Sequence, residues 1–182
     1  MPSCKCSPAD STVEGRVLFG EGRLAEALEA ARRGYQVCLD GGFTFHHPFT
    51  KLLLLLSFDS ALELGDRDAF DELMRTVDAA RPVDRTPLLD AIEAVARGRL
   101  HALDGDVQQA EPLLRDAARR FELMNMLFEQ ARALFELGCA LVTAEQPDEA
   151  AATLTNARMI FAQLGASPWT ERVDAVASAV VV

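Results

Sequence analysis

Apolar residues recur through much of this chain at the spacing of one face of an α-helix. The clearest set follows the pattern i, i+4, i+7, i+11 and i+14: Ala150, Leu154, Ala157, Phe161 and Leu164. This spacing is typical of a helix that buries one side. An equivalent set begins at Ala110, at an offset of 40 in residue number. Two copies in one register predict a repeated 40-residue helical unit.

Weaker copies extend the repeat toward the N-terminus. Gly65 aligns with Gly105 at the same offset, and Gly22 aligns with Gly65 at an offset of 43. We therefore expect four units, each made of a helix A, a short turn and a helix B. Their predicted bounds are residues 13–42, 47–81, 87–126 and 127–166. Residues 1–12 are expected to form a disordered tail, and residues 167–182 a capping helix and tail.

Turn residues separate the predicted helices. In Gly65-Asp66 and Gly105-Asp106, glycine is expected to end helix A with a positive φ, and aspartate to cap helix B. Thr86 and Ser167 each precede a proline, which predicts an N-cap followed by proline at the first helical position. Pro112 is expected near the first turn of its helix, where its missing N–H costs nothing.

These motifs resemble tetratricopeptide repeats. The matching residues are Leu134-x2-Leu137-Gly138-x2-Leu141 followed by Ala150-x3-Leu154-x2-Ala157, together with the phrase Ala110-Glu111-Pro112-Leu113-Leu114. In that family small residues let helix axes approach to about 8–10 Å. The resemblance implies an all-α fold: a right-handed α-solenoid of about four TPR-like hairpins with a C-terminal capping helix. It also implies that the A helices line a concave, ligand-binding face.

The repeat departs from the family pattern in two respects. Its 40-residue period is longer than the family's usual period of about 34, and Leu134 and Leu141 replace aromatic residues. Long, leucine-rich repeats of this kind resemble the sensor regions of MalT-like and LuxR-type bacterial transcriptional regulators. In those proteins a phrase similar to residues 164–172 often precedes a helix-turn-helix domain, and no such domain follows it within these 182 residues.

Charge argues against two classes of partner. The chain carries a formal net charge of −10, whereas nucleic acids and anionic membranes attract clustered basic residues. Its longest apolar runs, residues 52–56 and 179–182, are far below the ~20 residues that span a bilayer. No apolar signal-peptide region is present at the N-terminus. We expect a cytoplasmic protein that binds neither nucleic acid directly nor membranes.

Catalytic motifs are not evident. The sequence has no phosphate-binding glycine loop, dinucleotide fingerprint or serine-hydrolase elbow. We therefore expect no enzymatic activity and no cofactor or metal. Cys4, Cys6, His46 and His47 could supply four ligands, but their spacing fits no zinc pattern. A disordered tail and an exposed loop are the favoured interpretation of these residues.

The candidate partner-binding residues occupy matching positions on the predicted A helices. One row contains Arg16, Asp59, Arg99 and Cys139, and a second row contains Leu55, Val95 and Phe135. An arginine beside apolar residues suits an extended peptide, because it holds a carboxylate or carbonyl while side chains bury nearby. The alternative is that Val95 and Phe135 pack between hairpins and that Arg99 is solvated.

Two functions follow from this pattern. The first is a non-catalytic module that binds a protein or peptide and forms the sensor part of a bacterial signalling or transcriptional regulator. The second is a free-standing scaffold or adaptor that forms a homodimer through one end of the solenoid. An enzyme built on helical repeats is a residual third alternative.

Overall fold

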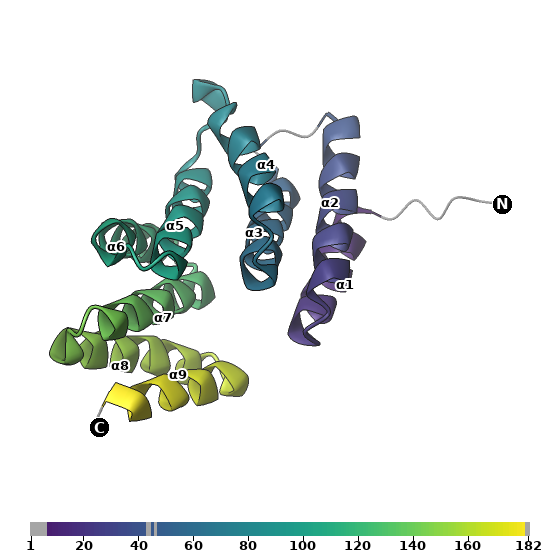
Figure 1. The fold of residues 1–182 in the computed structure, drawn as a ribbon. Helices are drawn as coiled ribbons and strands as arrows, with labels where there is room; N and C mark the ends of the chain where they lie inside the picture. The colour runs from purple at the N-terminus through teal and green to yellow at the C-terminus, as the bar shows by residue number, and fades with distance from the viewer. Residues whose placement is uncertain (1–6, 43–44, 46, 181–182) are drawn as a thin grey trace. The chain divides into compact units, whose positions relative to one another are not determined.

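The computed structural model describes residues 7–42, 45 and 47–180, and this part of the chain is all-helical, without strands. It confirms the predicted all-α class. A 3₁₀ turn at Pro82–Asp84 separates the fourth and fifth of the α-helices (Figure 1). Their bounds are α1 Pro8–Gly20, α2 Leu24–Asp40, α3 Pro48–Leu64, α4 Arg67–Asp78, α5 Pro87–Leu103, α6 Val107–Leu123, α7 Leu127–Thr143, α8 Pro147–Gln163 and α9 Ser167–Val180.

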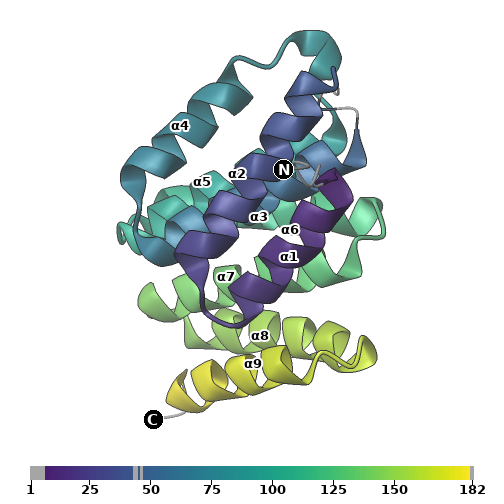
Figure 2. The same ribbon diagram turned by 90° about the vertical axis from the view of Figure 1, so that its right-hand side faces the viewer.

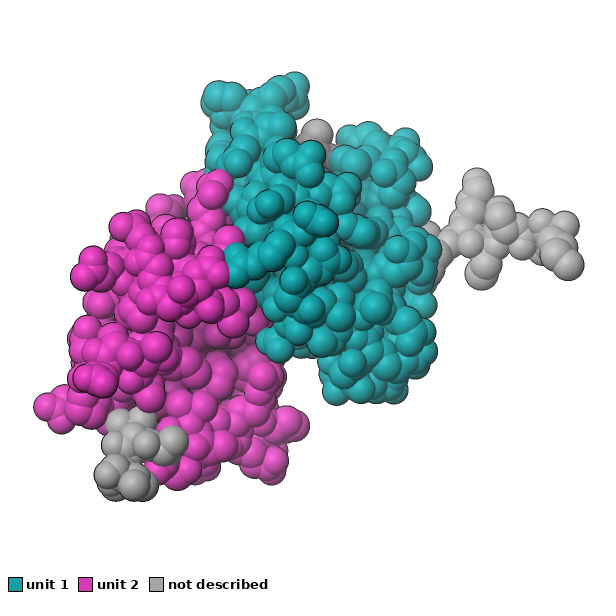
Figure 3. All heavy atoms as spheres, viewed as in Figure 1, with its two compact units in different colours: residues 1–89 teal, residues 90–182 magenta. Residues whose placement is uncertain are grey.

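The chain divides into two compact units (Figure 3). Unit 1 comprises Met1–Leu89 and unit 2 comprises Asp90–Val182. In unit 1, α3 contacts α1, α2 and α4. Figures 1 and 2 show α1, α2 and α3 side by side. In unit 2, α7 contacts both α6 and α8, and α9 packs against α8 and touches α7.

Four consecutive helices follow a strict 20-residue period. Helices α5, α6, α7 and α8 each contain 17 residues, and they begin at residues 87, 107, 127 and 147. The starts of α5 and α7 coincide with those predicted for the units at 87–126 and 127–166. A period of two helices therefore accounts for the 40-residue repeat in the sequence.

One residue with a positive φ ends helix A in each of the later turns. Gly65 and Gly105 take this conformation, as predicted. Glu145 occupies the position equivalent to Gly105 in the next repeat, with a φ of 57° and no glycine. Asn125 and Gly165 do the same between helices B and A. The left-handed residue thus recurs at positions 105, 125, 145 and 165, although two of these positions carry side chains.

Capping bonds fix the starts of three helices as predicted. The side chains of Asp66, Thr86 and Asp106 each accept a hydrogen bond from the backbone N–H three positions later, at 3.0–3.3 Å. Ser167 differs from its prediction, because α9 begins at this residue rather than after it.

The first helix begins earlier than predicted, at Pro8 rather than residue 13. Ser7 and Asp10 form a capping box there. The Ser7 hydroxyl accepts from the Asp10 backbone N–H at 3.2 Å, and the Asp10 carboxylate accepts from the Ser7 N–H at 3.1 Å. Residues 7–12 therefore do not belong to a disordered tail, because reciprocal hydrogen bonds satisfy the otherwise unpaired N–H groups of the first turn. Residues 1–6 lie outside the described part.

Pro112 also lies elsewhere than expected. It is the sixth residue of α6, in the second turn rather than near the first. There it removes the N–H that would bond the carbonyl one turn earlier. Its side chain is exposed, so the interruption faces away from the core.

Small residues let helices approach closely within unit 2. A Cβ atom added to Gly138 would lie 2.5 Å from Leu154 Cδ2, and one added to Gly98 would lie 2.8 Å from Leu114 Cγ. Gly98 and Leu114 each precede their counterparts by one 40-residue repeat. The two predicted hairpins therefore share the same packing contact between helix A and helix B.

Unit 1 places its close approaches around α3. Gly15 of α1 faces Leu56, and Gly34 of α2 faces Leu53 and Ser11. Both leucines are buried, so neighbouring helices cover them. Contacts from α1, α2 and α4 supply that cover within the unit.

Candidate binding site

The predicted A-helix rows differ in exposure. In unit 1, Arg16 is exposed on α1, whereas Leu55 and Asp59 are buried on α3. Arg16 is the member of this set that has an exposed side chain. Both side chains lie on α3 and belong to the interior of unit 1.

In unit 2 the predicted residues come from α5 and α7. Val95 and Phe135 are buried, and only 6% of the Arg99 surface is exposed. The Arg99 Nε atom donates to Glu136 Oε1 across 3.0 Å, which joins α5 to α7. The expectation of a solvated Arg99 is therefore wrong, because this guanidinium is buried and ion-paired. Packing of Val95 and Phe135 in the interior agrees with the alternative interpretation.

The first residues of α9 complete an aromatic cluster with α7 and α8. The Trp169 ring stacks on Phe161 with centroids 5.2 Å apart, and it meets Phe128 and Phe135 edge-on at 5.9 and 6.0 Å. Each such pair contributes about 0.5–1.5 kcal/mol beyond the area that it buries. Trp169 therefore packs against the α7–α8 hairpin.

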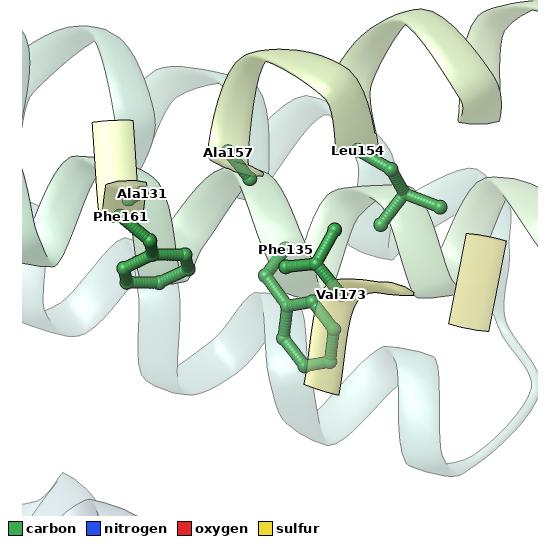
Figure 4. Close-up of a cluster of buried hydrophobic side chains, with 6 residues drawn as sticks. All are labelled: Ala131, Phe135, Leu154, Ala157, Phe161 and Val173. Carbon is green, nitrogen blue, oxygen red and sulfur yellow. The ribbon is translucent and has the colours of Figure 1, made fainter. Parts of the chain in front are cut away.

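A core of six buried side chains adjoins this cluster and shares Phe135 and Phe161 with it (Figure 4). Its members are Ala131, Phe135, Leu154, Ala157, Phe161 and Val173. They come from α7, α8 and α9, and Trp169 packs against them as a half-buried neighbour. The core fixes the backbone of α9 and hence the positions of the side chains that α9 presents.

Two arginines lie over the aromatic cluster. The guanidinium carbon of Arg172 is 4.6 Å from the centroid of Trp169 and 5.9 Å from that of Phe135. The Arg132 guanidinium carbon is 5.4 Å from Trp169. All three distances fall within the range of a cation–π contact. Arg132 is largely buried and paired with Glu129 at 3.2 Å, whereas Arg172 is exposed.

Arg172 also differs from the other arginines of unit 2 in its ion pairing. Within residues 90–178, each of the seven others has a carboxylate partner, and Arg172 has none. The pairs are Arg97–Glu93, Arg99–Glu136, Arg115–Glu111, Arg119–Asp116, Arg120–Asp116, Arg132–Glu129 and Arg158–Asp174. We call Phe135, Trp169 and Arg172 the Arg172 platform.

Cys139 borders this platform. Burial, with a smaller contribution from the Glu136 carboxylate, raises the pKa of its thiol to about 12, and Arg172 opposes this rise slightly. The thiol is therefore neutral at physiological pH, and a neutral thiol is a poor nucleophile. These influences show that Glu136, Cys139 and Arg172 share one neighbourhood.

The repeat pattern singled out Arg99, Phe135 and Cys139 as candidates, but it did not single out Glu136 and Arg172, which lie near them in the structure. The repeat contained a signal for Arg172, because it follows Arg132 by one 40-residue period. Extending the register into the last helix would have paired these two arginines. No comparable pattern identifies Glu136.

Only one of the four residues considered as metal ligands lies in the described part of the chain. Cys4, Cys6 and His46 lie outside the described residues, and His47 is half-buried immediately before α3. Among the residues described, no three or more His, Cys, Asp and Glu side chains gather as a metal site would require. None of the described helices combines the length and apolar character needed to cross a bilayer.

Comparison of the sequence with known proteins identifies no family. No family model matches the chain, and no characterised protein matches it significantly.

Proposed function

We propose that this chain is a TPR-like, right-handed α-solenoid module that binds a peptide or protein segment and catalyses no reaction. Three observations support the solenoid: the 20-residue helix period, the contacts between consecutive helices, and the Gly–Leu contact that recurs in successive hairpins. In this proposal α5, α7 and α9 are the A helices of unit 2. Their shared face carries the binding site.

The Arg172 platform, whose arginine is exposed, is the observation that favours binding. A surface arginine normally offsets a nearby carboxylate or extends into solvent. Here the guanidinium lies over two aromatic rings and has no carboxylate partner within residues 90–178. Aromatic residues and arginine are also the side chains that contribute most to protein–protein recognition.

The biological setting that we propose is a bacterial signalling or transcriptional regulator in the cytoplasm. In such a protein the module senses a partner, and no cofactor or metal takes part. The repeat style and the phrase at residues 164–172 support this setting. The net charge of −10 favours a neutral or cationic partner surface over nucleic acid.

Intrinsic fluorescence offers a direct test, because Trp169 is the single tryptophan of the chain. We expect peptides selected from a random display library to change the Trp169 emission saturably. Amide chemical shifts should then change mainly in α5, α7 and α9. The amide chemical shifts of α6 and α8, recorded in the same titration, are the matched control. Binding confined to α6 and α8, or no peptide selected at all, contradicts the proposal.

Self-association is a second candidate, favoured by exposed valines on α1. Val13 and Val17 are 65% and 54% exposed and lie one turn apart. We expect a homodimer formed through this end to dissociate when both valines are changed to Asp. Sedimentation equilibrium should show the difference, and a monomeric wild-type protein at high concentration excludes this candidate.

A further inference from the structure

We infer that Arg172 is the specificity-determining residue of this site and binds the side-chain carboxylate of an Asp or Glu in the partner segment. This inference rests on the proposed peptide-binding function and names the group that is recognised. It therefore predicts one acidic position in any peptide that binds unit 2. The rest of the peptide is expected to be neutral or basic, because the chain itself carries a net charge of −10.

The aromatic rings orient the arginine. Trp169 and Phe135 attract the guanidinium from 4.6 and 5.9 Å, and both rings are themselves held by the core of α7, α8 and α9. A guanidinium held in this way loses little freedom when a ligand binds. Its N–H groups remain available to a carboxylate, which can accept two parallel hydrogen bonds.

The neighbouring carboxylates of the described residues do not form an ion pair with the Arg172 guanidinium. Glu136 is paired with Arg99 at 3.0 Å, and Asp174 is paired with Arg158 at 2.6 Å. Glu171 is exposed and adjacent to Arg172 in α9, but consecutive helical residues do not face each other. Since no carboxylate within residues 90–178 pairs with Arg172, a carboxylate supplied by a partner would complement this guanidinium.

The local backbone favours an acidic side chain over a chain terminus. Terminal carboxylates are captured where several free backbone N–H groups converge. Phe135 and Arg172 lie inside helices, and the first-turn N–H groups of Trp169 and Thr170 both bond to the Ala166 carbonyl at 3.0 and 3.1 Å. The backbone around the platform therefore does not present the converging free N–H groups that capture a terminal carboxylate, and its charged donor is the Arg172 guanidinium.

The test is a display of random peptides about twelve residues long, performed in two formats, one with blocked and one with free C-termini. The wild-type protein is compared with Arg172→Gln and with Arg119→Gln. Arg119 is an exposed arginine of α6 that pairs with Asp116, so the control removes the same charge away from the platform. Circular dichroism verifies that each variant is folded.

We expect wild type and Arg119→Gln to select blocked peptides with Asp or Glu at one fixed position. Changing that residue to its amide should weaken binding to both proteins at least about ten-fold, the range of a charge-assisted hydrogen bond, but should hardly affect binding to Arg172→Gln. If Arg172→Gln does not fold, Arg172→Lys serves instead. It keeps the charge but loses the planar fork, so the affinity for the acidic peptide should fall several-fold.

Three results overturn the inference while leaving peptide binding intact. They are selected peptides without a fixed acidic position, selection only from free C-termini, or an equal loss of affinity in Arg172→Gln on removing the acid. Failure of the wild-type protein to select any peptide overturns the proposed function together with this inference.

Discussion

The two units achieve close helix packing in different ways. In unit 2, Gly98 and Gly138 each admit a leucine from the partner helix of the same hairpin. In unit 1, Gly15 and Gly34 lie on α1 and α2, and both face leucines of α3. Unit 2 thus repeats one contact in successive hairpins, whereas in unit 1 two helices pack against a third. Sequence repetition is therefore clear where a contact is reused, and it fades where one helix serves as a shared core.

Ion pairs in the two units also differ in how far they are exposed to solvent, as three of them show. In unit 1, the Arg32–Glu72 and Arg33–Glu14 pairs join exposed side chains. In unit 2, the Arg99–Glu136 pair is largely withdrawn from solvent. Exposed pairs contribute at most about 1 kcal/mol to stability, whereas loss of one partner of a buried pair costs about 3–5 kcal/mol.

The largest expected effect tests the difference between a buried and an exposed ion pair. Arg99→Met should lower the free energy of unfolding by about 3 kcal/mol, because Glu136 loses its partner in a poorly solvated position. The control Arg33→Met removes an exposed pair and should cost less than about 1 kcal/mol. Urea unfolding followed by circular dichroism measures both. Similar losses in the two variants would show that burial of the pair does not matter.

The glycine contrast predicts the next largest effect. Gly138→Ala should destabilise the protein by about 1–2 kcal/mol, because overpacking against Leu154 exceeds the gain in helix propensity. Gly20, at the end of α1, has open space where a Cβ atom would lie, with nothing within 4 Å. Gly20→Ala should therefore be neutral or stabilising by about 0.4–1 kcal/mol. In thermal melts Gly138→Ala should unfold at a lower temperature than the wild type and Gly20→Ala at the same or a higher one, and a stabilised Gly138→Ala contradicts the close contact.

A reciprocal change at equivalent turns should have a smaller effect. Glu145 has a positive φ in unit 2 at the position that Gly65 holds in unit 1. Glu145→Gly should stabilise the protein by up to about 1 kcal/mol by removing a strained side chain, and Gly65→Ala should destabilise it by a similar amount. Chemical denaturation of both variants, with Asn125→Gly as a further comparison, tests the shared geometry. Opposite signs from those expected would indicate that the two turns are not equivalent.

The last effect is absent at neutral pH and concerns stability in alkaline solution. Burial raises the pKa of Cys139 from 9.0 to about 12 and that of Tyr35 from 10.0 to about 12. Above the unfolded-state pKa the unfolded group loses its proton while the folded one retains it, so stability falls as pH rises toward 12. The decline should begin near pH 9 for Cys139 in unit 2 and near pH 10 for Tyr35 in unit 1.

Melting temperatures between about pH 8 and 11 measure this decline. Cys139→Ala should remove the earlier part and Tyr35→Phe the later part, with both variants matching the wild-type slope below about pH 8. An unchanged slope in Cys139→Ala would show that its thiol ionises as easily in the folded protein as in the unfolded chain.

Helix positions from residue 87 onward were predictable, because apolar spacing there follows one register without interruption. The turns at Asn125 and Glu145 were not recognisable, since neither position carries glycine, the residue expected there. The early start of α1 was also missed, although Ser7 and Asp10 carry the spacing of a capping box. Local side-chain hydrogen bonds decided that boundary independently of the apolar pattern.

For the candidate binding site, the sequence suggested helix faces but not which of their side chains are exposed. Arg99 and Phe135 occupy predicted positions, yet both are buried. Arg99 is neutralised by Glu136, which no repeat signal marks. Arg172 extends the 40-residue register into the last helix and is exposed without a carboxylate partner among residues 90–178. Pairing between side chains on different helices depends on distances that a periodic pattern does not contain.

The sequence by itself determined the all-α class, the 40-residue period and the small residues at which helices approach each other. These properties follow from local helix propensity and from which residues avoid water, and both are encoded in linear spacing. The tertiary structure alone decided which charges on different helices are paired and which aromatic rings meet. Those outcomes depend on how α5, α7 and α9 come together, because ion pairs and ring contacts form only over a few ångströms. The position of Arg172, over two aromatic rings and without a carboxylate partner within residues 90–178, is one of these outcomes.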